Sequence, residues 1–245
     1  MLGAPPSTPE PESNVSAAPE PRIYTLEEYL ILDELSHERY EFMNGRIYYR
    51  GGVPIEAASG MSGASEPHNL IMGNIFASVR ANIRGRGCRA YAADMRVRMG
   101  TGGEHSYPDV TALCGRPELE KLRGDTLLNP SLVVEVLSPS TEAYDRGEKF
   151  AQYARIPTLG EYVLVAQDRV HVERYTPGAP GAAWERTVYD ALDAAVDLPS
   201  LGAALPLRDV YADVDFPERP RPRVVREGEP DAAYAASPGG APGGA

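Results

Sequence analysis

The sequence predicts an α/β domain built on a mixed β-sheet flanked by helices. Apolar residues recur at helical spacing in three segments, near residues 26–35, 67–84 and 141–155, and short strand-like runs separate these segments. One such run, SLVVEVL at 131–137, is almost entirely apolar, as expected for a strand buried on both faces. The length of 245 residues is sufficient for one well-packed core. We therefore expect a single domain.

Each predicted element has a local reason. Thr25 with Glu28 three residues later forms a capping box ahead of LEEYLILDEL, and Asn44-Gly45 tolerates the positive φ angles of a hairpin turn. A helix is expected from Pro67 to Gly85, and Ser140 or Thr141 should cap a helix that ends near Arg155. Strands are expected in CRAYAADMRVRM, YPDVTALC, SLVVEVL, EYVLVA and RVHVERYT.

The two ends of the chain differ in composition from the rest. Residues 1–22 are rich in Pro, Ser, Ala and Glu, and residues 217–245 are rich in Pro, Gly and Ala. Neither segment has enough periodic apolar content to offset the entropy of ordering. We predict disordered tails at 1–22 and 217–245 and a folded domain over 23–216.

Composition also limits where the protein acts and what it binds. No stretch approaches the roughly 20 apolar residues of a membrane span, and the amino terminus lacks a signal-peptide pattern, so a cytoplasmic protein without membrane contact is expected. Cys88 and Cys114 lie in strand-like runs without CxxC spacing, which favours buried thiols over a disulfide or a zinc site. The net charge of −11 argues against a protein that coats nucleic acid.

Two carboxylates stand out by their positions within or at the start of apolar strands. Glu135 lies within LVVEVL, where an isolated charge would be unfavourable, so it must be protonated, paired or metal-bound unless the strand emerges into solvent there. Asp109 follows Pro108 at the start of a second strand, which places it at the rim of a sheet. If the two strand ends meet, their oxygens suit a hard cation such as Mg²⁺ or Mn²⁺.

The helix after the Glu135 strand carries Asp145, Lys149 and Tyr153 at four-residue spacing, which places all three on one face. A lysine leaning over the carboxyl end of that strand can meet negative charge that develops in a transition state. The alternative is an ordinary Asp145–Lys149 pair on the protein surface.

Together these motifs resemble the Uma-type restriction endonuclease family of the PD-(D/E)XK phosphodiesterase superfamily. The matching strings are YEFMNGRIYY, the histidine of EPHNLI, YPDVTAL, PSLVVEVLSPSTEAYDRGEKFAQYAR and EYVLVA. The similarity spans roughly residues 23–211. It implies a restriction-endonuclease-like fold and a metal-dependent phosphodiesterase.

The resemblance also implies roles for particular residues. Asp109 and Glu135 would hold the metal, with a strand carbonyl near Val136 as a possible further ligand and Glu41 as an additional acidic position. The usual superfamily lysine position is Leu137 here, and the family supplies the lysine from the following helix. The catalytic set implied is Asp109, Glu135, Lys149, Glu41 and His68.

The histidines carry unequal weight in this prediction. His68 matches a family histidine and could contact phosphate, substrate or a carboxylate, or could simply be a helix-capping, half-buried side chain. His105 is expected to be solvated in a Gly-rich loop. His37 and His171 have no acidic or metal-spaced partners in sequence and are expected to be structural.

A local excess of arginine is the best sequence candidate for contact with a phosphate backbone. The alternative is a solvated face balanced by remote acids. The run comprises Arg80, Arg84, Arg86, Arg89, Arg96 and Arg98.

The function predicted from these observations is hydrolysis of nucleic acid, with DNA expected as the substrate and Mg²⁺ or Mn²⁺ as the cofactor. One alternative is a nuclease-fold binding or regulatory module without turnover. A more remote one is a different carboxylate-pair hydrolase, such as a glycosidase. A homodimer is possible, because many nucleases of this superfamily pair to cut two strands.

Overall fold

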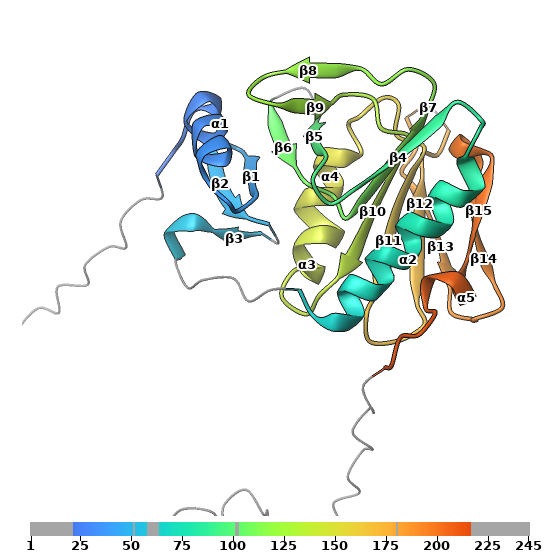
Figure 1. Ribbon diagram of the computed structural model, residues 1–245. Coiled ribbons are helices and arrows are strands. Elements are labelled where there is room, and N and C mark those ends of the chain that lie inside the picture. The colour runs from blue at the N-terminus through green and yellow to red at the C-terminus, as the bar shows by residue number, and fades with distance from the viewer. Residues whose placement is uncertain (1–21, 51, 58–63, 101–102, 180, 217–245) are drawn as a thin grey trace, which may run out of the picture.

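The computed structural model describes residues 22–50, 52–57, 64–100, 103–179 and 181–216 (Figure 1). The tails predicted at 1–22 and 217–245 lie outside these residues apart from Arg22, so their disorder stays a prediction. Arg22 is exposed and pairs with Glu28 at 3.0 Å. None of the helices in the described ranges is long and apolar enough to cross a membrane.

The described chain contains helices and mixed sheets, which confirms the α/β class. The helices are α1 (Leu26–Leu35), α2 (Glu66–Ile83), α3 (Glu142–Tyr144), α4 (Phe150–Tyr153) and α5 (Leu207–Val210), with a π-helical turn η2 (Asp145–Lys149) and 3₁₀ turns η1 (Ile55–Ala57) and η3 (Pro199–Leu201). The first strands are β1 (Tyr40–Met43), β2 (Arg46–Tyr49), β3 (Val53–Pro54), β4 (Cys88–Ala92), β5 (Arg96–Met99), β6 (Glu104–Ser106), β7 (Val110–Cys114) and β8 (Leu119–Lys121). The later strands are β9 (Asp125–Leu127), β10 (Leu132–Leu137), β11 (Glu161–Ala166), β12 (Val172–Thr176), β13 (Glu185–Tyr189), β14 (Ala195–Leu198) and β15 (Ala203–Pro206).

The strands form two large mixed sheets and a small one, where the sequence predicted a single mixed sheet. The six-stranded sheet has the order β13-β12-β11-β10-β7-β4, and the seven-stranded sheet has the order β3-β2-β1-β6-β5-β9-β8. Each contains one parallel pair, β10 with β11 and β5 with β9. The chain changes sheet after β4, where the amides of Asp94 and Met95 both turn back to the Ala92 carbonyl.

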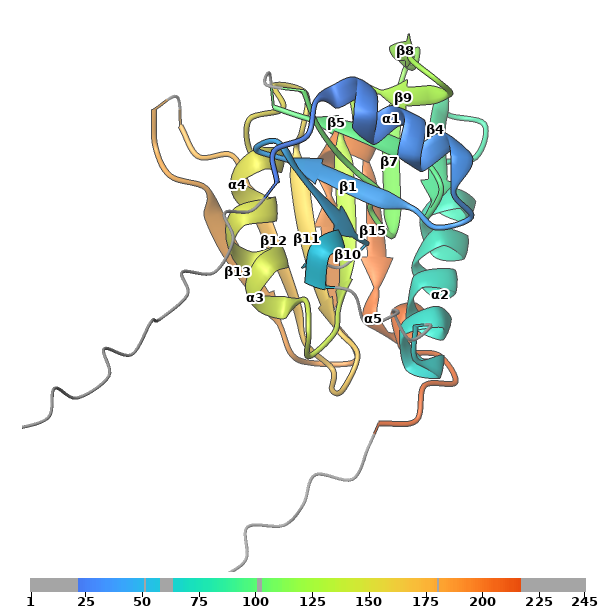
Figure 2. The same ribbon diagram turned by 90° about the vertical axis from the view of Figure 1, so that its left-hand side faces the viewer.

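Strand β10 separates two apolar cores. Leu132, Val134 and Val136 pack in the core that contains Ile71, Ile75, Val79 and Ile83 of α2. Val133 and Leu137 pack on the other side with Tyr153 of α4 and Leu164 of β11. Figure 2 shows α2 and α4 on opposite sides of the strands β10–β12. Glu135 therefore shares the α4 side with Val133 and Leu137, as alternation along the strand predicts.

Several predicted local motifs are present. Thr25 and Glu28 form both hydrogen bonds of the capping box at the start of α1. Asn44 and Gly45 have φ angles of 50° and 72° in the turn between β1 and β2. Ser65 caps α2, since its side chain accepts from the His68 amide.

The segment between β10 and β11 departs from a regular helix. The expected cap is absent, because the Thr141 hydroxyl accepts from the Ser138 amide instead of a helix amide. Residues Asp145–Lys149 then form a π-helical turn between α3 and α4. Single π turns inside helices shift the face on which later side chains lie. Both end residues of this turn, Asp145 and Lys149, are buried.

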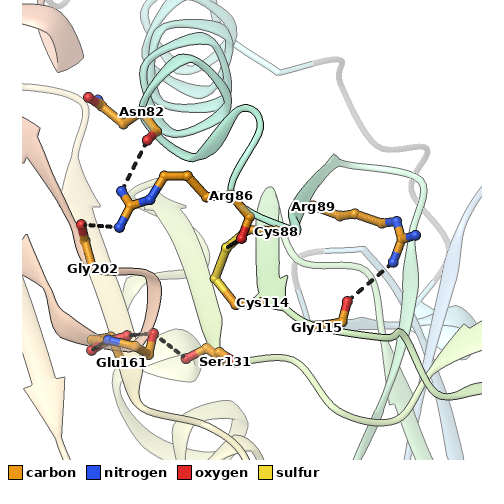
Figure 3. Close-up of a disulfide and its surroundings, with 10 residues drawn as sticks. Asn82, Arg86, Cys88, Arg89, Cys114, Gly115, Ser131, Glu161 and Gly202 are labelled. Carbon is orange, nitrogen blue, oxygen red and sulfur yellow. Dashed lines mark hydrogen bonds between the residues drawn. A yellow bond between two sulfur atoms is a disulfide. The ribbon is translucent and has the colours of Figure 1, made fainter.

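Cys88 and Cys114 form a disulfide, which corrects the prediction of two buried thiols (Figure 3). The two residues lie directly opposite each other in the antiparallel pair of β4 and β7, with their Cα atoms 3.9 Å apart. Directly opposed residues of adjacent antiparallel strands have their side chains on one face and within reach of each other. Cys114 is moreover exposed, at the end of its strand. Sequence spacing alone did not reveal this strand register.

Candidate active site

The pairing of β7 with β10 brings the two predicted carboxylates together. Val110 lies opposite Val134 in this antiparallel pair, so Asp109 and Glu135 are opposite each other one step further along. Each residue is only 4% exposed. The two strand ends therefore meet at one point, and both carboxylates line the same cavity.

Asp109 is held by donors on both carboxylate oxygens. Arg50 Nη2 donates to Oδ1 at 2.6 Å, and the Val136 amide donates to Oδ2 at 2.7 Å. His68 Nε2 lies 3.5 Å from Oδ2. Burial alone would raise the pKa of the Asp109 carboxyl, but His68, Arg50 and the Val136 amide together hold that pKa below its ordinary value.

The pKa of the Glu135 carboxyl is shifted in the opposite direction. Burial is the largest influence and raises the pKa of its carboxyl to about 8, Lys149 opposes the rise, and the neighbouring acids Asp145, Asp109 and Glu41 add to it. Glu135 Oε1 lies 2.9 Å from Lys149 Nζ, yet its orientation leaves it without a hydrogen bond among the described residues. The pKa values of the two carboxyl groups at the strand ends are thus shifted in opposite directions.

Lys149 lies at the centre of a buried acidic cluster. Its Nζ is 2.9 Å from Glu135 Oε1, 3.0 Å from Glu41 Oε1 and 3.5 Å from Asp145 Oδ1. Burial would lower the pKa of the Lys149 ammonium, but these three carboxyl groups hold it well above its ordinary value. Because Asp145 and Lys149 are 3% and 2% exposed, the alternative of an ordinary surface pair is wrong.

Glu41 enters the cluster from β1, in the other large sheet. Its side chain is fully buried, and Ser106 Oγ of β6 donates to Oε1 at 2.6 Å. The Tyr144 hydroxyl of α3 donates to Oε2 at 3.1 Å. The pairing of β1 with β6 aligns Phe42 with His105, which places Ser106 beside Glu41. The cluster therefore joins the two sheets through the segment between β10 and β11.

A cavity of about 720 Å³ opens above the carboxylates. Its walls come from the β1–β2 region, the start of α2, and the turn after β10. Four of the lining residues carry cationic or titratable nitrogen groups near the opening: His37, Arg39, Arg50 and His68. The deeper residues Asp109, Glu135, Asp145 and Lys149 complete the lining on the buried side.

The arginines that the sequence singled out lie elsewhere. None of these arginines is among the described residues that line the cavity. His68 is in the first turn of α2 and Arg80 in the last, about 18 Å further along the helix axis. Arg86 donates to the carbonyls of Asn82 and Gly202, and Arg89 donates to Gly115 O (Figure 3). Nucleic-acid contact by Arg80, Arg84, Arg86 and Arg98 stays a prediction.

Arg96 and Arg98 have partners within the fold. Arg96 is 3% exposed and donates to Asp33 Oδ2 at 3.1 Å and to Thr126 Oγ1 at 2.8 Å. The prediction that Arg96 contacts nucleic acid is therefore wrong, because its guanidinium neutralises a buried aspartate. Arg98 is half-buried and pairs with Glu120 at 3.3 Å.

Two histidines differ from the sequence prediction. His105 is fully buried instead of solvated; burial lowers its pKa to about 4, and Nδ1 lies 2.6 Å from the Gly103 carbonyl oxygen. His171 does have acidic neighbours, since Nε2 lies 2.9 Å from Glu173 Oε1 and Nδ1 lies 2.5 Å from Asp190 Oδ1. Glu173 lies only two positions after His171, a spacing that places both side chains on one face of a strand, so the sequence did indicate this neighbour. Asp190 is brought near by the pairing of β12 with β13.

Sequence reasoning missed three side chains that touch the predicted site. Arg50 binds Asp109, while Ser106 and Tyr144 bind Glu41. Arg50 directly follows the second strand of the hairpin that carries Glu41, so its place at a strand end was a usable signal. Ser106 and Tyr144 reach the site only through contacts between sheets, which the sequence alone does not specify.

The residues present fit a hard divalent cation. Within the described ranges no three His, Cys, Asp or Glu side chains are grouped so as to hold a metal ion. Mg²⁺, however, commonly takes one or two protein carboxylates and keeps several waters. Asp109 and Glu135 supply these oxygens, and Glu135 Oε1 is a buried acceptor without a hydrogen bond. The Val136 carbonyl points to the same side as its amide, toward Asp109.

The mixed sheets with helices packed against them form a restriction-endonuclease-like fold. The chain belongs to the Uma2 family, described as "Putative restriction endonuclease", whose profile matches residues 26–208. It is 32% identical over 200 residues to the uncharacterized protein slr1290 of Synechocystis sp., covering 82% of this chain and 97% of that protein. It is 34% identical over 154 residues to the uncharacterized protein sll1609 of the same organism, covering 63% and 81%.

Proposed function

We propose that the protein is a metal-dependent phosphodiesterase that hydrolyses nucleic acid, with DNA as the expected substrate and Mg²⁺ or Mn²⁺ as the cofactor. One observation carries this proposal: Lys149 is buried among Glu41, Glu135 and Asp145, next to Asp109, on the floor of a cavity with cationic side chains at its mouth. Membership in the Uma2 family supports the same reaction class.

Asp109 and Glu135 would hold the cation, with the Val136 carbonyl as a further oxygen on the same side. A bound divalent cation lowers the pKa of water and screens the phosphate. Lys149 supplies a fixed positive charge that meets the charge spread over the phosphoryl oxygens in the transition state. Ser106 and Tyr144 hold Glu41, which in turn fixes Lys149 through the 3.0 Å contact.

His68 and Arg50 lie on the open side of Asp109, where a phosphate can enter. Each has a nitrogen near an Asp109 oxygen, at 3.5 Å and 2.6 Å. They supply hydrogen-bond donors for the phosphate oxygens, and Arg39 adds a further positive charge to the same lining. Three carboxylates of the lining, Asp109, Glu135 and Asp145, are buried, whereas Arg39, Arg50 and the acidic Glu38 line its more accessible part.

Two other functions remain as alternatives. A binding module without turnover would keep metal and nucleic-acid affinity but show no cleavage. A glycosidase would need Phe, Tyr or Trp side chains on which sugars can stack. Tyr49 is the one residue of these three types among the described residues that line the cavity. The glycosidase is therefore disfavoured by the lining itself.

The decisive experiment compares Glu135→Gln with Glu161→Gln. Glu161 is also a buried glutamate, on the adjacent strand, but its carboxylate binds Ser200 and does not line the cavity. We expect Glu135→Gln to lower Mn²⁺- or Mg²⁺-dependent cleavage of DNA by at least about 100-fold, a loss typical of a removed catalytic group. Glu161→Gln should retain cleavage. Equal activity of Glu135→Gln and the unaltered protein would refute the proposal, and metal binding without any cleavage would favour the binding module.

A further inference from the structure

We propose that Arg50 is an exchangeable cation: it neutralises Asp109 in the metal-free protein and leaves for a substrate phosphate when a divalent ion binds. This inference rests on the proposed function. It makes metal binding and nucleic-acid binding reciprocal, so that each raises the affinity for the other.

The first observation is that both carboxylate oxygens of Asp109 already accept hydrogen bonds. Arg50 Nη2 donates to Oδ1 at 2.6 Å, and Oδ2 accepts from the Val136 amide at 2.7 Å. A divalent ion that binds Oδ1 would bring a second positive charge into contact distance of the guanidinium. Two such charges repel strongly in a partly buried site. The ion and Arg50 therefore compete for the same oxygen.

The second observation is that Arg50 is free to retreat while Lys149 is not. The Arg50 side chain is 31% exposed and has one recorded side-chain partner among the described residues, Asp109. The Lys149 side chain is 3% exposed and has three carboxyl partners. The Arg50 backbone stays anchored, because its amide donates to the Arg39 carbonyl at 3.3 Å. Of the two cations, Arg50 is the one that can move.

The third observation is that the cavity beside Arg50 offers space and other nitrogen groups for a phosphate. Arg50, Arg39 and His37 line the same side of the cavity of about 720 Å³. Arg39 is engaged only loosely, 3.5 Å from the exposed Asp94. A guanidinium matches two phosphate oxygens in a bidentate geometry, which makes a phosphodiester a suitable replacement for Asp109.

The test is Mn²⁺ titration by calorimetry on the full chain and on Arg50→Met, with Arg50→Gln as a second variant in case the first does not fold. Arg39→Met is the matched control, since it removes the same charge from the same cavity but not from Asp109. We expect Mn²⁺ to bind Arg50→Met or Arg50→Gln at least about five-fold more tightly, because the competing cation is gone. Arg39→Met should change the affinity by less than about two-fold.

A second arm measures the affinity for a short DNA duplex with and without Ca²⁺, which shares the preference for oxygen ligands. Ca²⁺ should raise the DNA affinity of the unaltered protein more than that of Arg50→Met. Unchanged or weaker Mn²⁺ binding by the Arg50 variants would overturn the exchange inference alone. Absence of Mn²⁺ binding by every variant and by the unaltered protein would overturn the metal site and the inference together.

Discussion

At the scale of single residues, the site pairs one buried ammonium group with several acids. Lys149 lies within 3.5 Å of oxygens from Glu41, Glu135 and Asp145. Burying these groups is unfavourable unless they neutralise one another, and removing one partner of a buried pair is far more costly than removing both. The ion pairs of the cluster should therefore contribute to the stability of the fold as well as to the proposed reaction.

Lys149→Met should lower the free energy of unfolding by about 3–5 kcal/mol at neutral pH, because it leaves the surrounding carboxyl groups without their cation. The double variant Lys149→Met with Glu135→Gln should be more stable than the sum of the single effects, by about 1 kcal/mol or more. Urea denaturation of the four proteins measures this coupling. Strict additivity would show that the two groups do not interact in solution.

Residues at strand ends were the most predictable part of the site. Glu135 was found because it interrupts an apolar strand and Asp109 because it opens one after a proline, and strand register then places them opposite each other. Glu41 and Lys149 came from the family resemblance, since nothing in the local sequence predicts a meeting between β1 and the segment after β10. Arg50 was missed because its partner lies 59 positions away in the chain.

At the scale of elements, the segment α3–η2–α4 is tied to the sheet by a charged cluster on its outer side. Arg146 donates to Glu142 Oε1 and to Glu173 of β12. Glu173 is 3% exposed and also accepts from the Tyr175 hydroxyl at 2.7 Å. The turn that carries Asp145 and Lys149 is therefore held from both sides. The π turn itself was not predictable, because four-residue spacing is the same in an ordinary helix.

Glu173 gives this attachment a pH dependence. Burial alone would raise the pKa of its carboxyl, but His171, Tyr175 and Arg146 lower it to about 2. A carboxyl whose pKa is lower in the folded state stabilises the fold above its unfolded pKa, about 4.5, and this contribution disappears as the pH falls toward 2. Stability should therefore fall more steeply between pH 4.5 and 2 in the unaltered protein than in Glu173→Gln. Parallel stability curves from urea denaturation would contradict this assignment.

The disulfide links β4 to β7, the strand that begins directly after Asp109. It closes a loop between residues 26 positions apart, which should contribute roughly 3 kcal/mol by restricting the unfolded chain. The double variant Cys88→Ser with Cys114→Ser should lose about this amount in urea denaturation. Adding reductant should destabilise the unaltered protein and leave the double variant unchanged. Equal stability of both proteins without reductant would show that the bond does not form or does not stabilise.

At the scale of the whole molecule, the net charge of −11 contrasts with the basic rim of the cavity. The sequence prediction placed the phosphate contacts on a long arginine run, but those side chains lie away from the cavity or are paired. Charge counted along the chain does not show which side chains gather in space. The fold class was predictable from periodicity, whereas the division into two sheets was not, because the chain passes from one large sheet to the other at several connections. The predicted homodimer stays a prediction.

A small basic rim on an acidic protein predicts weak and mildly salt-dependent binding to DNA. If two to four cations contact phosphates, the logarithm of the binding constant should fall with the logarithm of salt concentration with a slope of about −2 to −4. Fluorescence anisotropy with a short duplex in Ca²⁺ measures this slope. A slope near −8 would indicate a much larger basic surface, such as one that includes Arg80 and Arg84.

The connection between β10 and β11 also has an evolutionary consequence. It carries Lys149 fourteen positions after Glu135 of β10, and its turn at Ser138–Thr141 is closed by its own hydrogen bonds. An inserted or deleted residue in this stretch would rotate the lysine away from its carboxyl partners, although ordinary surface loops accept such changes readily. Natural relatives should therefore diverge here by substitution and keep the length fixed. Gaps in their aligned sequences should instead collect in connections that carry no active-site group, such as the one between β12 and β13.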